Sequence, residues 1–164
     1  MGIEALNSII RGSIIAGWTF ALNEKSALIG CAACGDQEAI ALMMKDPSNI
    51  FDIAMGGFID LLRRLVGEGG ADVNAAEKSG STAVMGASRG GHLGCIKYLV
   101  GEGGADVNAA ALNGWTAVML ASQGGHLDCI KYLVGEGGAD VNAANKDGWT
   151  AVMLASQGGH LDCI

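Results

Sequence analysis

The stretch "GWTAVMLASQGGHLDCI" occurs twice in this chain, letter for letter, at residues 114–130 and again at residues 148–164. The longer segments 80–113 and 114–147 are identical at 27 of 34 positions. An aspartate marks successive copies at the same interval of 34 residues: Asp72, Asp106 and Asp140. Self-similarity with a period of about 20 to 50 residues is typical of a stack of similar structural units. The period therefore decides the fold class before any local pattern does.

The repeat continues toward the N-terminus with more substitutions. Residues 56–76 are in register with residues 90–110. Residues 26–44 align with residues 82–100 at an offset of 56, so two periods are twelve residues short there, about the length of one connecting loop. The sequence predicts these units: a degenerate N-terminal cap or partial repeat at 1–22, a degenerate repeat at 23–45, full repeats at 46–79, 80–113 and 114–147, and a truncated repeat at 148–164.

Each unit is predicted to form two short helices and a projecting turn. In the third full copy, we expect the Thr116 hydroxyl to cap a helix over residues 117–123, which Gly124 and Gly125 end. A second helix is expected over residues 126–134. Its apolar side chains recur at steps of three and four, which places them on one helix face: Leu127, Ile130, Leu133 and Val134. Helices shorter than about 12 residues are marginal alone, so stacking against neighbouring copies must stabilise them.

Composition narrows the class of partner. The formal net charge is −7 and no run of Lys or Arg interrupts it, which argues against a nucleic-acid partner because phosphates repel carboxylates. No segment approaches the ~20 apolar residues of a membrane span, so no membrane partner is expected. The short apolar run at 13–22 lacks the basic leader of a secretory signal. Five cysteines without secreted-framework spacing favour a reducing compartment, so we expect the cytoplasm, with the nucleus as the alternative.

The recurring cysteines and histidines invite a disulfide or metal site, and we expect neither. Equivalent positions of stacked helices lie ~8–10 Å apart, whereas a disulfide needs Cα atoms within roughly 4.4–6.8 Å and zinc needs its ligands ~2.0–2.3 Å from one ion. We expect the cysteines to pack in the core as small apolar side chains: Cys95, Cys129 and Cys163. We expect the histidines to form local hydrogen bonds at the helix–helix turn: His92, His126 and His160.

Nor do other motifs indicate catalysis. Cys31 and Cys34 align with the body and end of a first helix, which favours packing over a redox or zinc site. The recurrent "GEGG" lacks the Lys of a phosphate-binding loop, and no nucleophile motif is present. We therefore expect no enzyme activity, no catalytic residue, no metal, no cofactor and no small-molecule substrate.

The unit "GWTAVMLASQGGHLDCIKYLVGEGGADVNA" (114–143) resembles the ankyrin repeat, whose pattern is roughly G-x-T-P-L-H-x-A-A-x-x-G-H, then L-L-x-x-G-A-D-V-N-A. The resemblance implies an all-α ankyrin-repeat solenoid of stacked helix-turn-helix units with projecting β-turn loops. Three departures stand out. Ala117 replaces the family's Pro, and Met119 replaces a His that normally shares hydrogen bonds with the Thr. One extra residue in "GEGG" makes the unit 34 residues long rather than 33. Within the chain, Gly86 stands where the next copy has Leu120, which predicts lost packing.

In the ankyrin family, the projecting turns and the exposed edge of the first helix usually hold the partner. Carried over by position, the implied partner-binding residues are Lys78, Ser79, Ser81, Arg89, Leu112, Asn113, Trp115, Gln123, Lys146, Asp147, Trp149 and Gln157. Five of the seven differences between the two most similar copies fall in this region. The resemblance thus implies a non-catalytic interaction scaffold for an unidentified partner protein, centred on Trp115 and Trp149, although each Trp could instead lie flat on its own hairpin.

Two other interpretations stay open. The chain could be the substrate-targeting ankyrin segment of a larger multidomain enzyme, such as a kinase, a ubiquitin ligase or an acyltransferase. Alternatively, the near-identical copies could reflect recent duplication with no partner at all.

Overall fold

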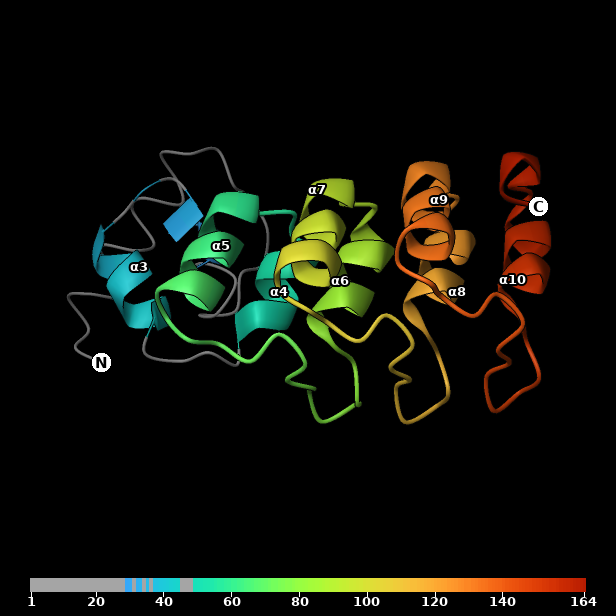
Figure 1. The fold of residues 1–164 in the computed structure, drawn as a ribbon, viewed down its shortest axis with the longest axis horizontal. Coiled ribbons are helices and arrows are strands. Elements are labelled where there is room, and N and C mark those ends of the chain that lie inside the picture. The colour runs from blue at the N-terminus through green and yellow to red at the C-terminus, as the bar shows by residue number, and fades with distance from the viewer. Residues whose placement is uncertain (1–28, 31, 34, 36, 45–48) are drawn as a thin grey trace.

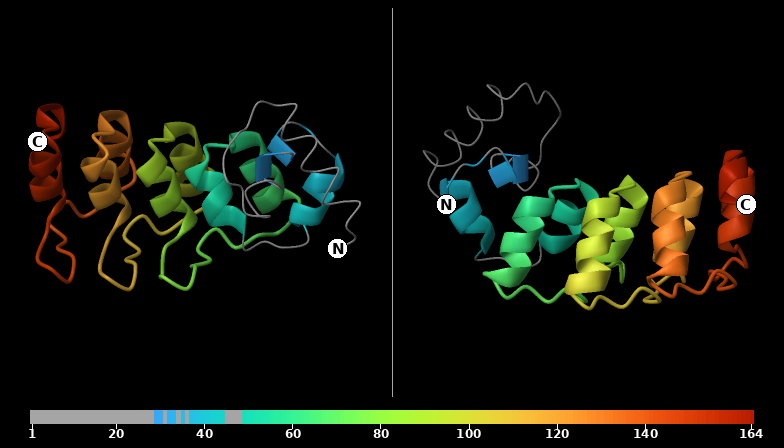
Figure 2. Two further views of the ribbon diagram at one scale, coloured as in Figure 1. Left: turned by 180° about the vertical axis from the view of Figure 1, so that it is seen from behind. Right: turned by 45° about the horizontal axis from the view of Figure 1, so that its top comes forward.

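Helix pairs stand in a row along the long axis of the molecule (Figure 1). The computed structural model describes residues 29, 30, 32, 33, 35, 37–44 and 49–164. The predicted unit at 1–22, the apolar run at 13–22 and the pair Cys31 and Cys34 lie outside the described residues, and the unit at 23–45 is described only in part. Long loops leave the row on one side, and the view from behind in Figure 2 shows them on that same side.

The helices form two layers. First helices pack on first helices along the row, and second helices on second helices. Their bounds are α3 Gln37–Met44, α4 Ile50–Met55, α5 Ile59–Gly67, α6 Ala83–Gly90, α7 Leu93–Lys97 continuing as η2 Tyr98–Glu102, α8 Ala117–Gln123, α9 Leu127–Gly135, α10 Ala151–Gly158 and η3 Leu161–Cys163. Within the described ranges the only β pairing is two isolated bridges, Ala76 with Thr82 and Ala144 with Thr150. The predicted all-α solenoid is confirmed, and the helix predicted over 117–123 is confirmed at both ends.

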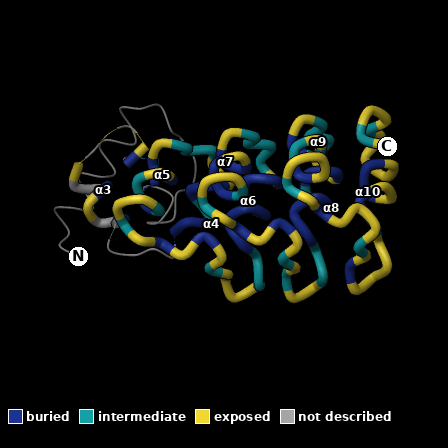
Figure 3. The backbone as a smooth tube through the Cα atoms, viewed as in Figure 1, coloured by how far each residue is buried: buried dark blue, intermediate teal, exposed yellow. Residues whose placement is uncertain are grey.

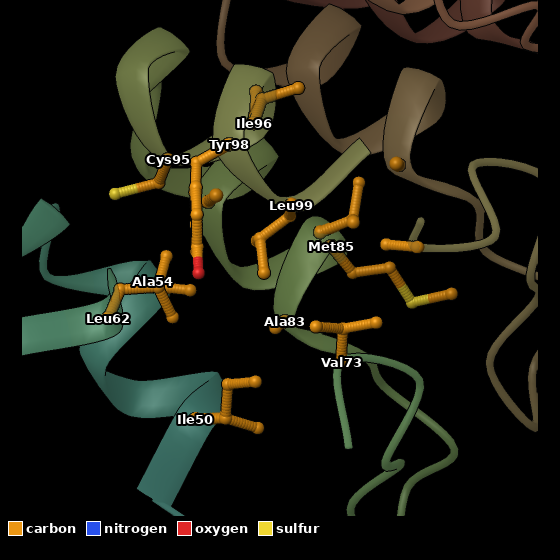
Figure 4. Close-up of a cluster of buried hydrophobic side chains, with 14 of the residues drawn as sticks. Ile50, Ala54, Leu62, Val73, Ala83, Met85, Cys95, Ile96, Tyr98 and Leu99 are labelled. Carbon is orange, nitrogen blue, oxygen red and sulfur yellow. The ribbon is translucent and has the colours of Figure 1, made fainter. Parts of the chain in front are cut away.

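The core is one continuous cluster that runs from unit to unit. Leu65, Leu99 and Leu133 occupy the same place in successive second helices, and each is fully buried. Figure 4 shows how the units interlock: Ala54 and Leu62 of one pair lie opposite Cys95 and Leu99 of the next. Figure 3 shows the buried residues along the middle of the row and the exposed ones on the loops. No unit encloses a core of its own, because the apolar side chains inside the row are covered by neighbouring units. Val152 and Met153 on α10 have no such cover and are exposed.

The apolar face predicted for the second helix is partly wrong. Cys129 and Leu133 carry the burial of α9, whereas Leu127 and Ile130 are half-buried and Val134 is exposed. The equivalent of Ile130 one unit earlier, Ile96, is fully buried. The difference follows from the neighbour, since α7 lies against the full helix α9, and α9 lies against the single turn η3.

The hydroxyl cap predicted for Thr116 is also wrong. Thr116 precedes α8 with the extended backbone of an N-cap, but its side chain makes no cap hydrogen bond. Its buried Oγ1, like that of Thr82, has no hydrogen-bond partner among the described residues. Met119 provides the reason, because a thioether cannot replace the ring nitrogens of the family's His. Met119 is fully buried and contributes apolar packing instead, as predicted.

The "GEGG" segment ends each second helix in a widened turn. In three successive copies a backbone N–H donates to the carbonyl five residues back: Gly69 to Arg64 at 3.1 Å, Gly103 to Tyr98 at 2.8 Å and Gly137 to Tyr132 at 2.9 Å. Such a bond encloses one more residue than the four-residue bond of an α-helix. The turn accommodates the additional residue of the 34-residue unit at the place where the sequence predicted it.

Candidate functional site

The projecting hairpins are joined in register by backbone hydrogen bonds. Leu112 N–H donates to the carbonyl of Ser79 at 2.9 Å, and Lys146 N–H donates to the carbonyl of Asn113 at 3.0 Å. The turn glycine Gly80 permits this approach, because its φ is +79° and an added Cβ would lie 2.8 Å from Leu112 N. The hairpin tips therefore form one continuous edge rather than separate loops.

A second set of bonds holds the base of the loops. The Asn108 side chain accepts a hydrogen bond from Asp140 N–H at 2.8 Å, across the boundary between two units. Asn74 and Asp106 repeat the same bond one unit earlier at 2.8 Å. The Asp106 carboxylate meanwhile accepts from Asn108 N–H at 2.9 Å within its own loop. The aspartates that mark the sequence period thus shape the loops, and the asparagines two residues later join them.

The histidines form a third set, and the prediction that they bond locally is wrong. Each Nε2 donates to a backbone carbonyl of the preceding unit: His92 to Met55 at 2.9 Å, His126 to Arg89 at 3.2 Å and His160 to Gln123 at 3.1 Å. These carbonyls lie at the C-terminal ends of first helices, where no intrahelical donor is available. Each ring also lies against the glycine turn of that unit, since a Cβ added at Gly91 would be 2.6 Å from His126 Nδ1.

The hairpins and first helices surround a hollow of about 270 Å³, which we call the Phe51 hollow. It is lined by Phe51, Ser81, Met85, Arg89, Ala111, Asn113, Trp115, Leu120 and Gln123. Five of the predicted site residues are in this set. Lys78 and Ser79 line a neighbouring hollow of about 560 Å³, which Phe51 also borders. The remaining five lie exposed on the hairpins and on α10, outside these two hollows: Leu112, Lys146, Asp147, Trp149 and Gln157.

The sequence prediction missed four residues of this lining: Phe51, Met85, Ala111 and Leu120. Of those on first helices, Phe51 is the one whose side chain departs from the later copies of the repeat. It lies on α4 at the position that Met85 and Met119 hold in later copies. A Cβ added at Gly86 would lie 2.8 Å from the carbonyl oxygen of Phe51 and 3.2 Å from its ring. The prediction that Gly86 loses packing is therefore wrong, because the missing side chain lets α4 and the Phe51 ring approach α6. Two adjoining departures from the repeat, Phe for Met and Gly for Leu, were the available signal.

The two tryptophans, for which two placements stayed open, differ in burial. Trp115 is half-buried, packs against the core and lines the Phe51 hollow. Trp149 is exposed. Its backbone N–H donates to the Asn145 side chain at 2.9 Å, which fixes the hairpin beneath it.

The remaining chemistry concerns one charged side chain in the Phe51 hollow and the cysteines, which lie outside it. Arg89 is the one charged residue in the lining of the Phe51 hollow, and its side chain is exposed. The cysteines at 95, 129 and 163 are free thiols. Burial raises the pKa of the Cys95 thiol from 9.0 to about 11, and burial followed by the Asp128 charge raises that of Cys129. Both thiols are consequently protonated and weakly nucleophilic at neutral pH.

The described part of the chain contains neither a cluster of metal-ligating side chains nor a membrane-spanning helix. No three His, Cys, Asp or Glu residues in it gather closely enough to hold a metal ion. No helix in it has the length and apolar character needed to cross a bilayer.

Comparison with known proteins identifies the class. A family model described as ankyrin repeats (3 copies) matches residues 28–111, 50–145 and 103–164. No curated protein matches the chain. Because the matched segments span most of its length, the chain belongs to the ankyrin-repeat family. Ankyrin repeats generally serve as protein–protein interaction modules.

Proposed function

We propose that this protein is a non-catalytic scaffold that binds a partner protein on the surface formed by its hairpins and first helices. The observation that carries the proposal is the hairpin edge joined by backbone bonds between units, which together with α6 and α8 surrounds the Phe51 hollow with five candidate residues. A preorganised surface loses little entropy when a partner binds. Trp and Arg, which dominate binding energy at protein interfaces, both line it.

The Phe51 hollow is smaller than a typical small-molecule site, whereas the neighbouring hollow of about 560 Å³ is not. The volume of the Phe51 hollow, about 270 Å³, lies just below the range of about 300 to 1,000 Å³ that small-molecule sites occupy. An open hollow of this size fits one large side chain of a partner. The proposed location is the cytoplasm, with the nucleus as the alternative, and free thiols suit both compartments. The targeting segment of a larger enzyme stays a prediction.

The proposal is tested with Trp115→Ser, which places at 115 the residue that the preceding copy has at the same position, Ser81. Peptides are first selected from a displayed random library on the unaltered protein, and their affinities are then measured by fluorescence polarisation. We expect Trp115→Ser to weaken binding at least tenfold, about 1.4 kcal/mol. Lys131→Gln, an exposed change on α9, should leave it unchanged.

Thermal melts of all variants by circular dichroism show whether the fold persists. If Trp115→Ser melts as the unaltered protein does and every selected peptide still binds it equally well, the hairpin and first-helix surface is not the binding site.

A further inference from the structure

The Phe51 hollow differs in its lining residues from the equivalent surface one unit later, whose residues lie 34 positions further along the chain. Five of its residues change chemistry between the two surfaces: Phe51 becomes Met85, Ser81 becomes Trp115, Arg89 becomes Gln123, Ala111 becomes Asn145 and Asn113 becomes Asp147. The equivalent surface one unit later thus has no arginine and carries the carboxylate of Asp147. In a chain of near copies, a partner that recognises these differences can bind in only one register.

Arg89 sets the charge of the Phe51 hollow. Its guanidinium is exposed and makes no ion pair within the described residues, unlike Arg63 and Arg64, which pair with Glu102 and Glu68. Guanidinium presents a planar fork of donors that matches a carboxylate in a bidentate pair. The net charge of −7 does not cancel this local preference, because charges beyond about 8 Å are largely screened at physiological salt. The lining itself holds no carboxylate.

The rest of the lining is mixed. Phe51, Ala111, Trp115 and Leu120 contribute apolar surface, Met85 is almost fully buried, and Ser81, Asn113 and Gln123 contribute polar surface, so that about half of the hollow is polar. Gly86 lets the Phe51 ring lie against α6, because the ring occupies the space that a side chain at 86 would fill. Partly desolvated apolar walls beside an unpaired cation favour a ligand that carries one apolar group and one negative charge close together.

We propose that the Phe51 hollow binds an acidic segment of a partner protein, with one large apolar side chain in the hollow and a neighbouring Asp or Glu carboxylate paired with Arg89. This inference rests on the proposed function, since it names the chemistry of the segment that the same surface binds. Charge complementarity at Arg89 distinguishes it from a basic segment, and the side chains of Phe51, Trp115 and Leu120 in the lining favour an apolar side chain over a polar one.

The test uses an array of short synthetic peptides with one central Leu, Met, Phe or Trp, flanked by Asp and Glu, by Ser and Gln, or by Lys and Arg. Arg89→Gln is the informative variant, because Gln stands at the same position in the next two copies, at 123 and 157. We expect the acidic peptides to bind most tightly and to lose about threefold to tenfold in affinity with Arg89→Gln. Lys131→Gln removes an exposed positive charge from α9 and should change nothing.

Two further measurements separate charge from packing. Raising the salt concentration should weaken binding of the acidic peptides to the unaltered protein more than to Arg89→Gln, because salt screens the ion pair. Phe51→Met, again the residue of the next copy, should reduce discrimination among the central side chains while the preference for acidic flanks remains.

Three outcomes overturn the inference. The first is tighter binding of the basic or the neutral peptides than of the acidic ones. The second is an equal loss of affinity with Arg89→Gln and with Lys131→Gln. The third is that the free protein forms dimers that Arg89→Gln abolishes, which would make a second copy of the chain the occupant of the hollow. The proposed function survives the first two if Trp115→Ser still weakens the peptides that do bind. It fails separately if no variant of the hairpins or first helices affects any of them.

Discussion

Gly91→Ala tests the bonds that join successive units. Gly91 ends α6 with a φ of +72°, a left-handed conformation that costs a residue with a Cβ about 1 to 2 kcal/mol. The added Cβ would lie 2.6 Å from Nδ1 of His126, so the ring must move. That movement breaks the bond from His126 Nε2 to the Arg89 carbonyl, worth about 0.5 to 1.5 kcal/mol. We expect a total loss of about 1.5 to 3.5 kcal/mol in the free energy of unfolding.

Gly159→Ala is the matched control. Gly159 ends α10 with nearly the same φ, +74°, but nothing lies within 4 Å of an added Cβ. This variant should show only the conformational cost, about 1 to 2 kcal/mol. Both variants are measured by urea unfolding with far-ultraviolet circular dichroism.

A double-mutant cycle isolates the steric contact. In a His126→Ala background the ring is absent, so Gly91→Ala should cost no more than Gly159→Ala does. If Gly91→Ala costs the same with and without the His126 ring, the histidine does not bind the units together and the reasoning is refuted.

Three other changes follow from the structure. Thr116→Val should stabilise the protein or leave it unchanged, because the buried hydroxyl has no partner and costs about 1 to 3 kcal/mol; urea unfolding that shows the usual loss of a helix cap would contradict this. Gly86→Leu, which copies Leu120, should destabilise it, since an added Cβ meets the Phe51 carbonyl at 2.8 Å; an unchanged melting temperature would show that α4 yields easily. Protein stability should fall between pH 9 and pH 11, because burial raises the pKa of the Cys95 thiol from 9.0 to about 11 and the folded state keeps a proton that the unfolded state releases; urea unfolding that shows a rise in stability over this interval would contradict this.

The sequence predicted the fold well because the fold depends on a period. Stacked units bury the same position repeatedly, so the spacing of 34 residues was enough to indicate a stack of units, and Thr116 with the glycines at 124 and 125 was enough to give the bounds of α8. The histidines show the limit of this approach. Their recurrence was visible, but their partners lie 37 residues away across a unit boundary, and a period alone does not say which unit supplies the acceptor.

The candidate site was predictable only in outline. Position within the repeat pointed to Arg89, Trp115 and Gln123, all of which line the Phe51 hollow. Phe51 itself was missed because it looks like one more apolar residue of a first helix. Its contact with Gly86 depends on how closely α4 and α6 pack, which only coordinates show. Burial of Trp115 but not Trp149 likewise depends on the neighbouring helices.

The most direct measurement is amide hydrogen exchange of the protein with and without a bound peptide from the displayed library. Binding on the proposed surface should slow exchange in the hairpins at 77–81 and 111–115 and along α6 and α8, which surround the Phe51 hollow. Slowing confined to α7, α9 and the "GEGG" turns would place the partner on the opposite layer of helices and contradict the proposed function.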